Sequence, residues 1–174
     1  MKVIKIGLDL DGVIVDKPPL ISKNLLEWLV RSHQNKDLAY RFPESKIEQW
    51  LRVFTHQPLF RPAIKKNLEF VKKLAADKKY KLYLISGRYS FLENRTAQWL
   101  KHHQLEGLFE KVLINLKNEQ PHLFKEKMIK KMKIDIFIDD DEPLVNYLSS
   151  HFPKTKIVYL ESDENFNRHH LLRA

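Results

Sequence analysis

Short apolar segments that end in polar side chains constrain the fold of this 174-residue chain most strongly. They occupy residues 2–9, 81–86 and 134–139; the first and third end in Asp, and the second ends in Ser. An apolar run of this length bounded by polar residues is typical of a buried strand. Polar residues at strand ends indicate a site along one edge of a sheet.

Amphipathic segments separate these runs from one another and from two further short strands, predicted at 111–116 and 156–160. Helices are predicted over 19–33, 44–55, 62–77, 90–103, 121–133 and 142–152. Ser90 with Glu93 forms a capping-box pattern at the start of the fourth helix. Strands that alternate with helices require crossover connections, so the predicted fold class is α/β with a doubly wound, mainly parallel sheet.

The segment between the first two strands departs from this alternation. Residues 17–60 contain two predicted helices and no strand, which we interpret as a small α-helical cap inserted into the core. Residues 1–16 and 61–174 then form the α/β core, and Phe60-Arg61-Pro62 marks the return of the chain to it. A chain of this length fits one domain with such an insertion.

The composition excludes several classes of protein. There are no cysteines, which rules out disulfides, thiol catalysis and thiolate metal sites. No apolar run approaches the ~20 residues of a membrane span, and the first residues do not read as a signal peptide. We therefore expect a cytoplasmic protein without membrane association; the sequence indicates no oligomeric state.

The net charge of +9 arises from 31 Lys and Arg against 22 Asp and Glu. A basic surface can attract nucleic acid or phosphate esters. The lysines are spread along predicted helix faces without a dense patch, which favours solvated helices over a nucleic-acid surface. Nucleic acid stays a possible but less favoured partner.

Four motifs occur in an order that resembles the haloacid dehalogenase-like (HAD) superfamily. They are DLDGVIVD at 9–16, ISGR at 85–88, Lys125, and IDDD at 138–141. Together they span most of the chain, and their order is more specific than any one of them. The resemblance implies a Rossmann-like core and Mg²⁺-dependent phosphoryl chemistry. A carboxylate can attack phosphorus and split one slow hydrolysis into two easier steps.

The resemblance also implies individual roles. Asp9 would be the nucleophile and a metal ligand. Asp11 would protonate the leaving group, activate water and offer Mg²⁺ its backbone carbonyl. Asp140 would be the second carboxylate ligand, with Asp139 beside it. Asp141 and Glu142 are better explained as the acidic start of the following helix.

The remaining candidates would bind the phosphoryl group. Ser86 would donate a hydrogen bond to its oxygens, and Lys125 would neutralise charge in the transition state. Gly12 lets the chain turn sharply after Asp11, and Gly12 and Gly87 are assigned to substrate binding. Arg88 has two readings: a substrate contact, as in polynucleotide-end phosphatase domains that the Ser-Gly-Arg segment resembles, or a surface salt bridge.

The expected function is a HAD-type phosphatase that acts on a small phosphorylated metabolite or nucleotide. The alternatives are a nucleic-acid-end phosphatase and a catalytically silent binding or regulatory module. A receiver domain has the wrong order of Lys and acids, and a metal-dependent nuclease would not need Ser86 and Lys125 here. The cap arginines Arg31, Arg41 and Arg52 are candidate specificity contacts, although surface solvation is favoured for them. Surface or packing roles are expected for the histidines, and packing for Trp28, Trp50 and Trp99.

Overall fold

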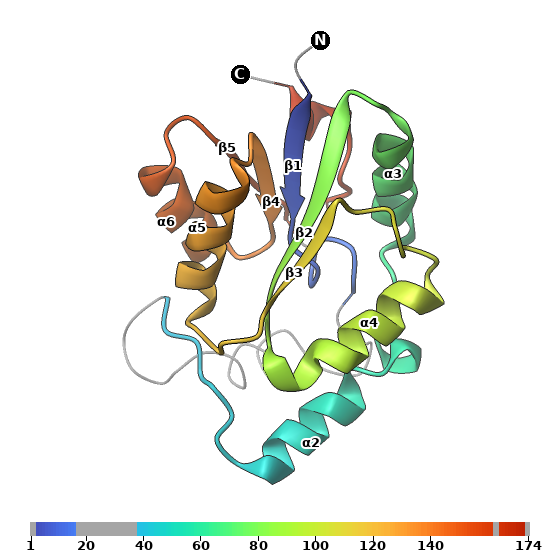
Figure 1. Ribbon diagram of the computed structural model, residues 1–174, viewed down its shortest axis with the longest axis vertical. Coiled ribbons are helices and arrows are strands. Elements are labelled where there is room, and N and C mark those ends of the chain that lie inside the picture. The colour runs from blue at the N-terminus through green and yellow to red at the C-terminus, as the bar shows by residue number, and fades with distance from the viewer. Residues whose placement is uncertain (1–2, 17–37, 162–163, 173–174) are drawn as a thin grey trace.

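A computed structural model of the chain describes residues 3–16, 38–161 and 164–172 (Figure 1). The predicted helix at 19–33, with Trp28 and Arg31, lies outside these residues. The described residues form one five-stranded sheet in the order β3-β2-β1-β4-β5, with every neighbouring pair parallel. The strands are β1 (Ile4–Leu8), β2 (Tyr80–Tyr89), β3 (Lys111–Asn115), β4 (Ile136–Asp139) and β5 (Lys156–Tyr159).

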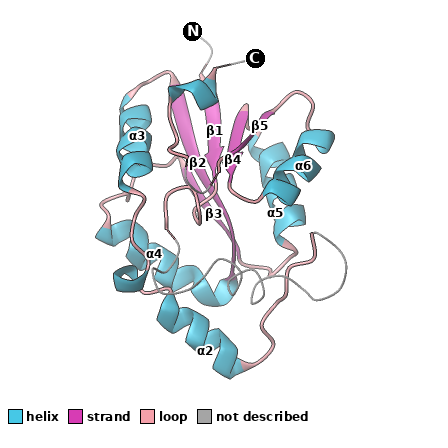
Figure 2. Ribbon diagram, turned by 180° about the vertical axis from the view of Figure 1, so that it is seen from behind, coloured by secondary structure: helices cyan, strands magenta, loops and turns pink. Residues whose placement is uncertain are grey.

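Helices cover both faces of the sheet (Figures 1 and 2). Helices α3 (Lys65–Ala76) and α4 (Glu93–His102) pack on one face against a core that includes Leu8, Leu84 and Trp99. Helices α5 (Pro121–Met132) and α6 (Glu142–His151) cover the other face. This three-layer arrangement confirms the predicted α/β, doubly wound architecture.

Two local predictions need correction at the end of β2. The strand was expected to end at Ser86, but it continues to Tyr89 with a register shift between these two residues. A short 3₁₀ helix, η2 (Ser90–Leu92), then precedes α4, whose N-cap is Leu92 without a side-chain cap. The capping box predicted at Ser90 is therefore wrong, because the strand extends past the point where the local pattern starts a helix.

Helix α2 (Lys46–Thr55) and the 3₁₀ helix η1 (Pro58–Phe60) lie beyond the carboxyl ends of the strands (Figure 1). Helix α2 turns its apolar stripe of Ile47, Trp50, Leu51 and Phe54 to the surface. Trp50 is 66% exposed, so its predicted packing role is wrong, whereas Trp99 is fully buried as expected. Periodicity identifies an apolar face but not the direction in which it points.

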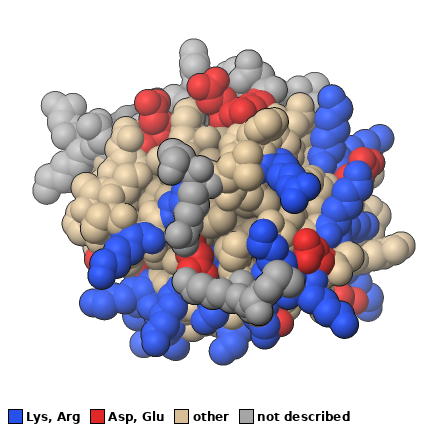
Figure 3. Space-filling model, turned by 90° about the horizontal axis from the view of Figure 1, so that it is seen from above, with Lys and Arg blue, Asp and Glu red and all other residues tan. Residues whose placement is uncertain are grey.

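On the face seen in Figure 3, the surface charges follow the dispersed pattern that the sequence indicates. On the face with the amino ends of the strands, Lys and Arg are spread around the margin and interrupted by acidic side chains (Figure 3). None of the described helices is both long and apolar enough to span a membrane. A further 3₁₀ helix, η3 (Arg168–Leu171), lies near the C-terminus.

A fully buried asparagine connects three distant segments below the site. Asn67 of α3 donates 2.7 Å to the carbonyl of Val13 in the loop after β1. Its Oδ1 accepts 2.8 Å from the backbone N–H of Phe166. The loop that carries the first motif is therefore fixed to both α3 and the C-terminal segment.

We predict that Asn67→Ala lowers the free energy of unfolding by about 2–4 kcal/mol, because the substitution leaves a buried carbonyl and a buried N–H without partners. Urea denaturation of the purified variant measures this change. Glu69→Ala, on the exposed side of the same helix, is the matched control and should change the free energy by less than about 0.5 kcal/mol. Equal losses in the two variants would contradict the prediction.

Candidate active site

Three aspartates meet where β1 and β4 end, at the point where the strand order reverses. Asp9 follows β1, Asp139 ends β4, and Asp140 comes next. One carboxylate oxygen from each lies within 4.8 Å of the other two. Burial raises the pKa of Asp9, and the charge of Asp139 adds to this increase against the opposing effect of Lys125. Burial likewise raises the pKa of Asp139.

Lys125 of α5 is buried between two of these carboxylates. Its Nζ donates 2.7 Å to Asp139 Oδ2 and lies 3.1 Å from Asp9 Oδ1. Burial alone would lower the pKa of Lys125, but the charges of Asp139 and Asp9 outweigh it and hold the pKa well above its usual value. The ammonium therefore stays charged and offsets part of the repulsion between the aspartates.

Gly87 permits this approach of α5 to β2. A Cβ atom on Gly87 would lie 3.0 Å from Pro121 Cβ and 3.7 Å from Lys125 Cε. Pro121, in the first turn of α5, therefore limits the size of the side chain at position 87.

The aspartate cluster fits a hard divalent cation. Asp9 Oδ1 is buried and has no hydrogen-bond partner among the described residues; its contact with Lys125 Nζ, at 3.1 Å, is an ion pair. Gly12 has φ +74°, and a Cβ atom there would lie 1.9 Å from Asp140 Oδ2. Only glycine therefore leaves room for the Asp140 carboxylate at the cluster. Carboxylate oxygens are hard ligands of the kind that Mg²⁺ takes in proteins.

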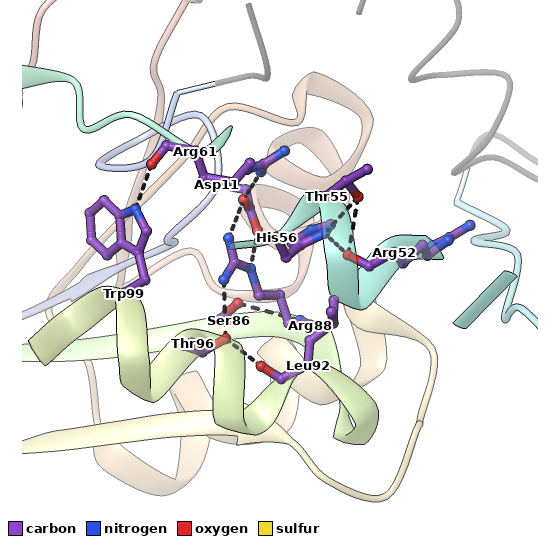
Figure 4. A network of polar contacts seen from close by, with 10 residues as sticks. All are labelled: Asp11, Arg52, Thr55, His56, Arg61, Ser86, Arg88, Leu92, Thr96 and Trp99. Carbon is purple, nitrogen blue, oxygen red and sulfur yellow. Dashed lines mark hydrogen bonds and ion pairs between the residues drawn. The ribbon is translucent and has the colours of Figure 1, made fainter. Parts of the chain in front are cut away.

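Two arginines pair with the carboxylate of Asp11 (Figure 4). Arg88 binds it bidentately, with Nε 2.6 Å from Oδ2 and Nη2 2.7 Å from Oδ1. Arg61 Nη2 also pairs with Oδ1. Burial by itself raises the pKa of Asp11, but the two guanidinium groups outweigh it and hold the pKa well below its usual range.

Arg88 is a fixed part of the core rather than a surface residue. Its side chain is 4% exposed, and Nη1 donates 3.1 Å to Thr96 Oγ1, which in turn donates to the carbonyl of Leu92. Its backbone N–H donates 3.3 Å to Oγ of Ser86, which is buried. The reading of Arg88 as a surface salt-bridge residue is therefore wrong.

Sequence reasoning missed two basic residues that face Asp11. Arg61 follows η1, and Trp99 Nε1 fixes it by donating 2.7 Å to its backbone carbonyl (Figure 4). His56, the C-cap of α2, lies on the other side of Asp11 and makes a 2.7 Å hydrogen bond from Nδ1 to the carbonyl of Arg52. A carbonyl oxygen only accepts, so Nδ1 carries the proton.

Tyr40, which was not among the predicted site residues, contacts Asp141, the residue after Asp140. The hydroxyl of Tyr40 donates to Asp141 Oδ2, and burial followed by this negative charge raises the pKa of Tyr40. The side chain of Gln120 contacts both backbone polar groups of Tyr40. Asp141 is the N-cap of α6 and accepts from the N–H of Leu144, which supports its assignment to the helix start.

The candidate residues thus gather in two adjacent groups. Asp9, Asp139, Asp140 and Lys125 form the first, with Gly12 and Gly87 giving it space, and Asp11, Ser86 and Arg88 lie in the second. Of the cap arginines that the structure describes, Arg41 and Arg52 both pair with Glu48 of α2.

Solved structures resemble the whole of this chain. A HAD family enzyme from Bacteroides thetaiotaomicron, an Asp-to-Ala mutant crystallised with magnesium and inorganic phosphate, has a TM-score of 0.61 at 16% identity. The match covers 99% of this chain and 100% of that one. The chain has a haloacid dehalogenase-like fold.

Two further structures share the HAD-like fold. An archaeal β-phosphoglucomutase from Pyrococcus sp. strain ST 04 has a TM-score of 0.58 at 14% identity, over 93% of this chain and 88% of that one. A chain of the Pnkp1/Rnl/Hen1 RNA repair complex has a TM-score of 0.56 at 13% identity, over 95% of this chain and 44% of that one. No protein-family model and no curated protein matches the sequence.

We predict that His56 makes the protein sensitive to mild acid. Burial, together with Arg88 and Arg61, lowers the pKa of His56 from its usual 6.5 to about 3. Between these values the unfolded chain binds a proton that the folded chain does not, so stability falls as the pH falls from 6.5 toward 3. As the pH falls from 7 to 5, the unfolding free energy of His56→Gln should therefore drop by about 1–2 kcal/mol less than that of the wild type.

Urea denaturation at both pH values measures this difference. His102→Gln is the matched control, because His102 is exposed at the end of α4. Identical pH dependence in the wild type and His56→Gln would show that His56 is protonated as easily in the folded protein as in the unfolded chain.

Proposed function

We propose that the chain is a Mg²⁺-dependent phosphohydrolase that cleaves a phosphate monoester through an aspartyl-phosphate on Asp9. The observation that carries this proposal is the buried, unbonded Oδ1 of Asp9, which lies beside Lys125 and the carboxylates of Asp139 and Asp140. An ordinary buried carboxylate would satisfy both oxygens. One left available at a charged strand edge suits a nucleophile.

The proposed reaction has two steps. The Asp9 carboxylate attacks phosphorus, the bond from phosphorus to the leaving oxygen breaks, and Asp11 gives that oxygen its proton. Asp11 then takes a proton from the water that attacks the aspartyl-phosphate, which releases inorganic phosphate and restores Asp9.

Asp9 and Asp140 would hold the metal together with the backbone carbonyl of Asp11, and Asp139 would support them through Lys125. Bound Mg²⁺ would neutralise the negative charge that the nucleophile and the phosphate bring together. Lys125 and the hydroxyl of Ser86 would stabilise the transferring phosphoryl oxygens. Gly12 and Gly87 leave space at the same edge.

The ion pairs with Arg88 and Arg61 limit when Asp11 can act as a general acid. A general acid must carry its proton, and the guanidinium groups of Arg88 and Arg61 oppose protonation. The ionised form suits the second step, in which Asp11 accepts a proton from water. The first step requires that substrate binding weaken at least one of these ion pairs.

We assign residues 17–60 to a cap and the rest of the chain to the core. Three residues of this segment or directly after it reach the site: Tyr40, His56 and Arg61. Contacts from an inserted segment would select the leaving group and exclude water. This arrangement favours small phosphorylated metabolites or nucleotides as substrates.

Hydrolysis of p-nitrophenyl phosphate tests the proposal directly. We expect turnover with Mg²⁺, loss of turnover with EDTA, and a decrease in kcat of at least ~10³-fold in Asp9→Asn, because the amide is not a nucleophile. Asp77→Asn, at the end of α3 and before the amino end of β2, is the matched control and should keep full activity.

Unchanged activity in Asp9→Asn would refute the nucleophile assignment. A wild-type protein that is inactive on this ester and on a panel of phosphorylated metabolites and nucleotides would favour the silent binding module.

A nucleic-acid-end phosphatase is the second candidate, favoured by the exposed aromatics of α2. The rings of Trp50 and Phe54 stack with centroids 5.9 Å apart, and Phe60 adjoins them at 5.3 Å from Phe54. Exposed aromatic rings stack well with unpaired bases. If this candidate is correct, 3′- or 5′-phosphorylated oligonucleotides should be hydrolysed faster than mononucleotides, and Trp50→Ala should remove that advantage, which phosphate-release assays measure.

A further inference from the structure

Arg61 is a buried cation whose hydrogen-bonding capacity is only partly used. Its side chain is 7% exposed, and its Nε is buried without a hydrogen-bond partner among the described residues. A buried charged donor left unpaired is costly, so its presence calls for an explanation. An anionic ligand that replaces Asp11 as the partner of this guanidinium would supply the missing bond.

Arg88 differs from Arg61 in this respect. Three of its nitrogens already bond to Asp11 and Thr96, and these contacts orient the guanidinium from within the core (Figure 4). Arg88 alone satisfies Asp11 with a bidentate pair. Arg61 adds a second positive charge to a carboxylate that is already paired.

Among the described residues, the surroundings of Asp11 therefore have an excess of positive charge. Two guanidinium groups face one carboxylate, and the side chain of Asp11 is 33% exposed while those of the arginines are almost buried. A ligand that reaches the exposed part of Asp11 meets Arg61 beside it, because Arg61 Nη2 pairs with Asp11 Oδ1. Arg61 also comes from the return of the proposed cap, where specificity contacts are expected.

We propose that Arg61 binds a second anionic group of the substrate, a carboxylate or a second phosphate carried by the leaving group within a few bonds of the scissile phosphate. This inference rests on the proposed function, because it places the leaving group at Asp11. A planar guanidinium forms two parallel hydrogen bonds with either kind of anion. The second anion would take over the contact of Arg61 with Asp11.

The test compares ligands that differ only in the second anion. The pair D-3-phosphoglycerate and glycerol 3-phosphate differs by a carboxylate in place of a hydroxymethyl group. Adenosine 3′,5′-bisphosphate and adenosine 5′-monophosphate differ by a phosphate. Calorimetry with Mg²⁺ and the Asp9→Asn protein measures the dissociation constants without turnover.

We expect the ligand with the second anionic group to bind at least about tenfold more tightly than its partner in at least one pair. Which pair shows the preference identifies a carboxylate or a phosphate as the second anion. Adding Arg61→Gln should reduce the ratio of dissociation constants to near one. Arg61→Lys, which keeps the charge but loses the planar fork, should leave a reduced preference. Arg41→Gln is the matched control, since it removes an exposed arginine that pairs with Glu48, and it should leave the ratio unchanged.

Ratios near one for both pairs in the Arg61-containing protein, or a preference that survives Arg61→Gln, would overturn the inference. If Arg61→Gln fails to fold, as judged by circular dichroism, Arg61→Lys alone decides: an undiminished ratio overturns the inference and a reduced ratio supports it. Failure of the proposed function is recognised separately, because the p-nitrophenyl phosphate assay depends on Asp9 and on no second anion.

Discussion

Repulsion between buried carboxylates is the constraint on which the rest of this structure depends. Parallel pairing of β1 with β4 places Asp9 and Asp139 at the same edge of the sheet, where both are almost fully buried. Neither could remain ionised there without compensation. Lys125 provides it from α5, and Gly87 lets that helix come close enough to β2 for the ammonium to reach the strand ends. The pairing of β1 with β4 brings the aspartates together, and α5 with Gly87 brings Lys125 close enough to compensate their charge.

The parts of this site that are local in sequence could be predicted, and those that depend on tertiary contacts could not. Asp9, Asp139 and the helix start at Asp141 follow from apolar strands that end in acids, because strand direction and capping are set by neighbouring residues. Arg61 gave no such signal, since Phe60-Arg61-Pro62 indicates only a change of direction. Its importance comes from Asp11 and Trp99, which are distant in sequence.

The same limit explains the errors at α2. Its apolar stripe was detected by its period, but the period cannot tell whether a helix turns that stripe toward the core. Here the polar side of the helix faces the site, with Arg52 and His56 half-buried and Trp50 at the surface. His56 was expected to be a packing or surface residue, but its ring lies beside Asp11.

The two groups of charges at the site differ in how they are balanced. At the strand edge, among the described residues, Lys125 pairs with Asp9 and Asp139, and Asp140 brings a third carboxylate within 4.8 Å of theirs, an arrangement that fits a divalent cation. At Asp11 the imbalance is reversed, since two arginines face one carboxylate. A phosphate monoester bound across both groups would place its phosphoryl group at the cation and its leaving group at the arginines. Opposite imbalances at two ends of one site favour a substrate with negative charge at both ends, because such a molecule neutralises the arginines that an ester without a second anionic group would leave uncompensated.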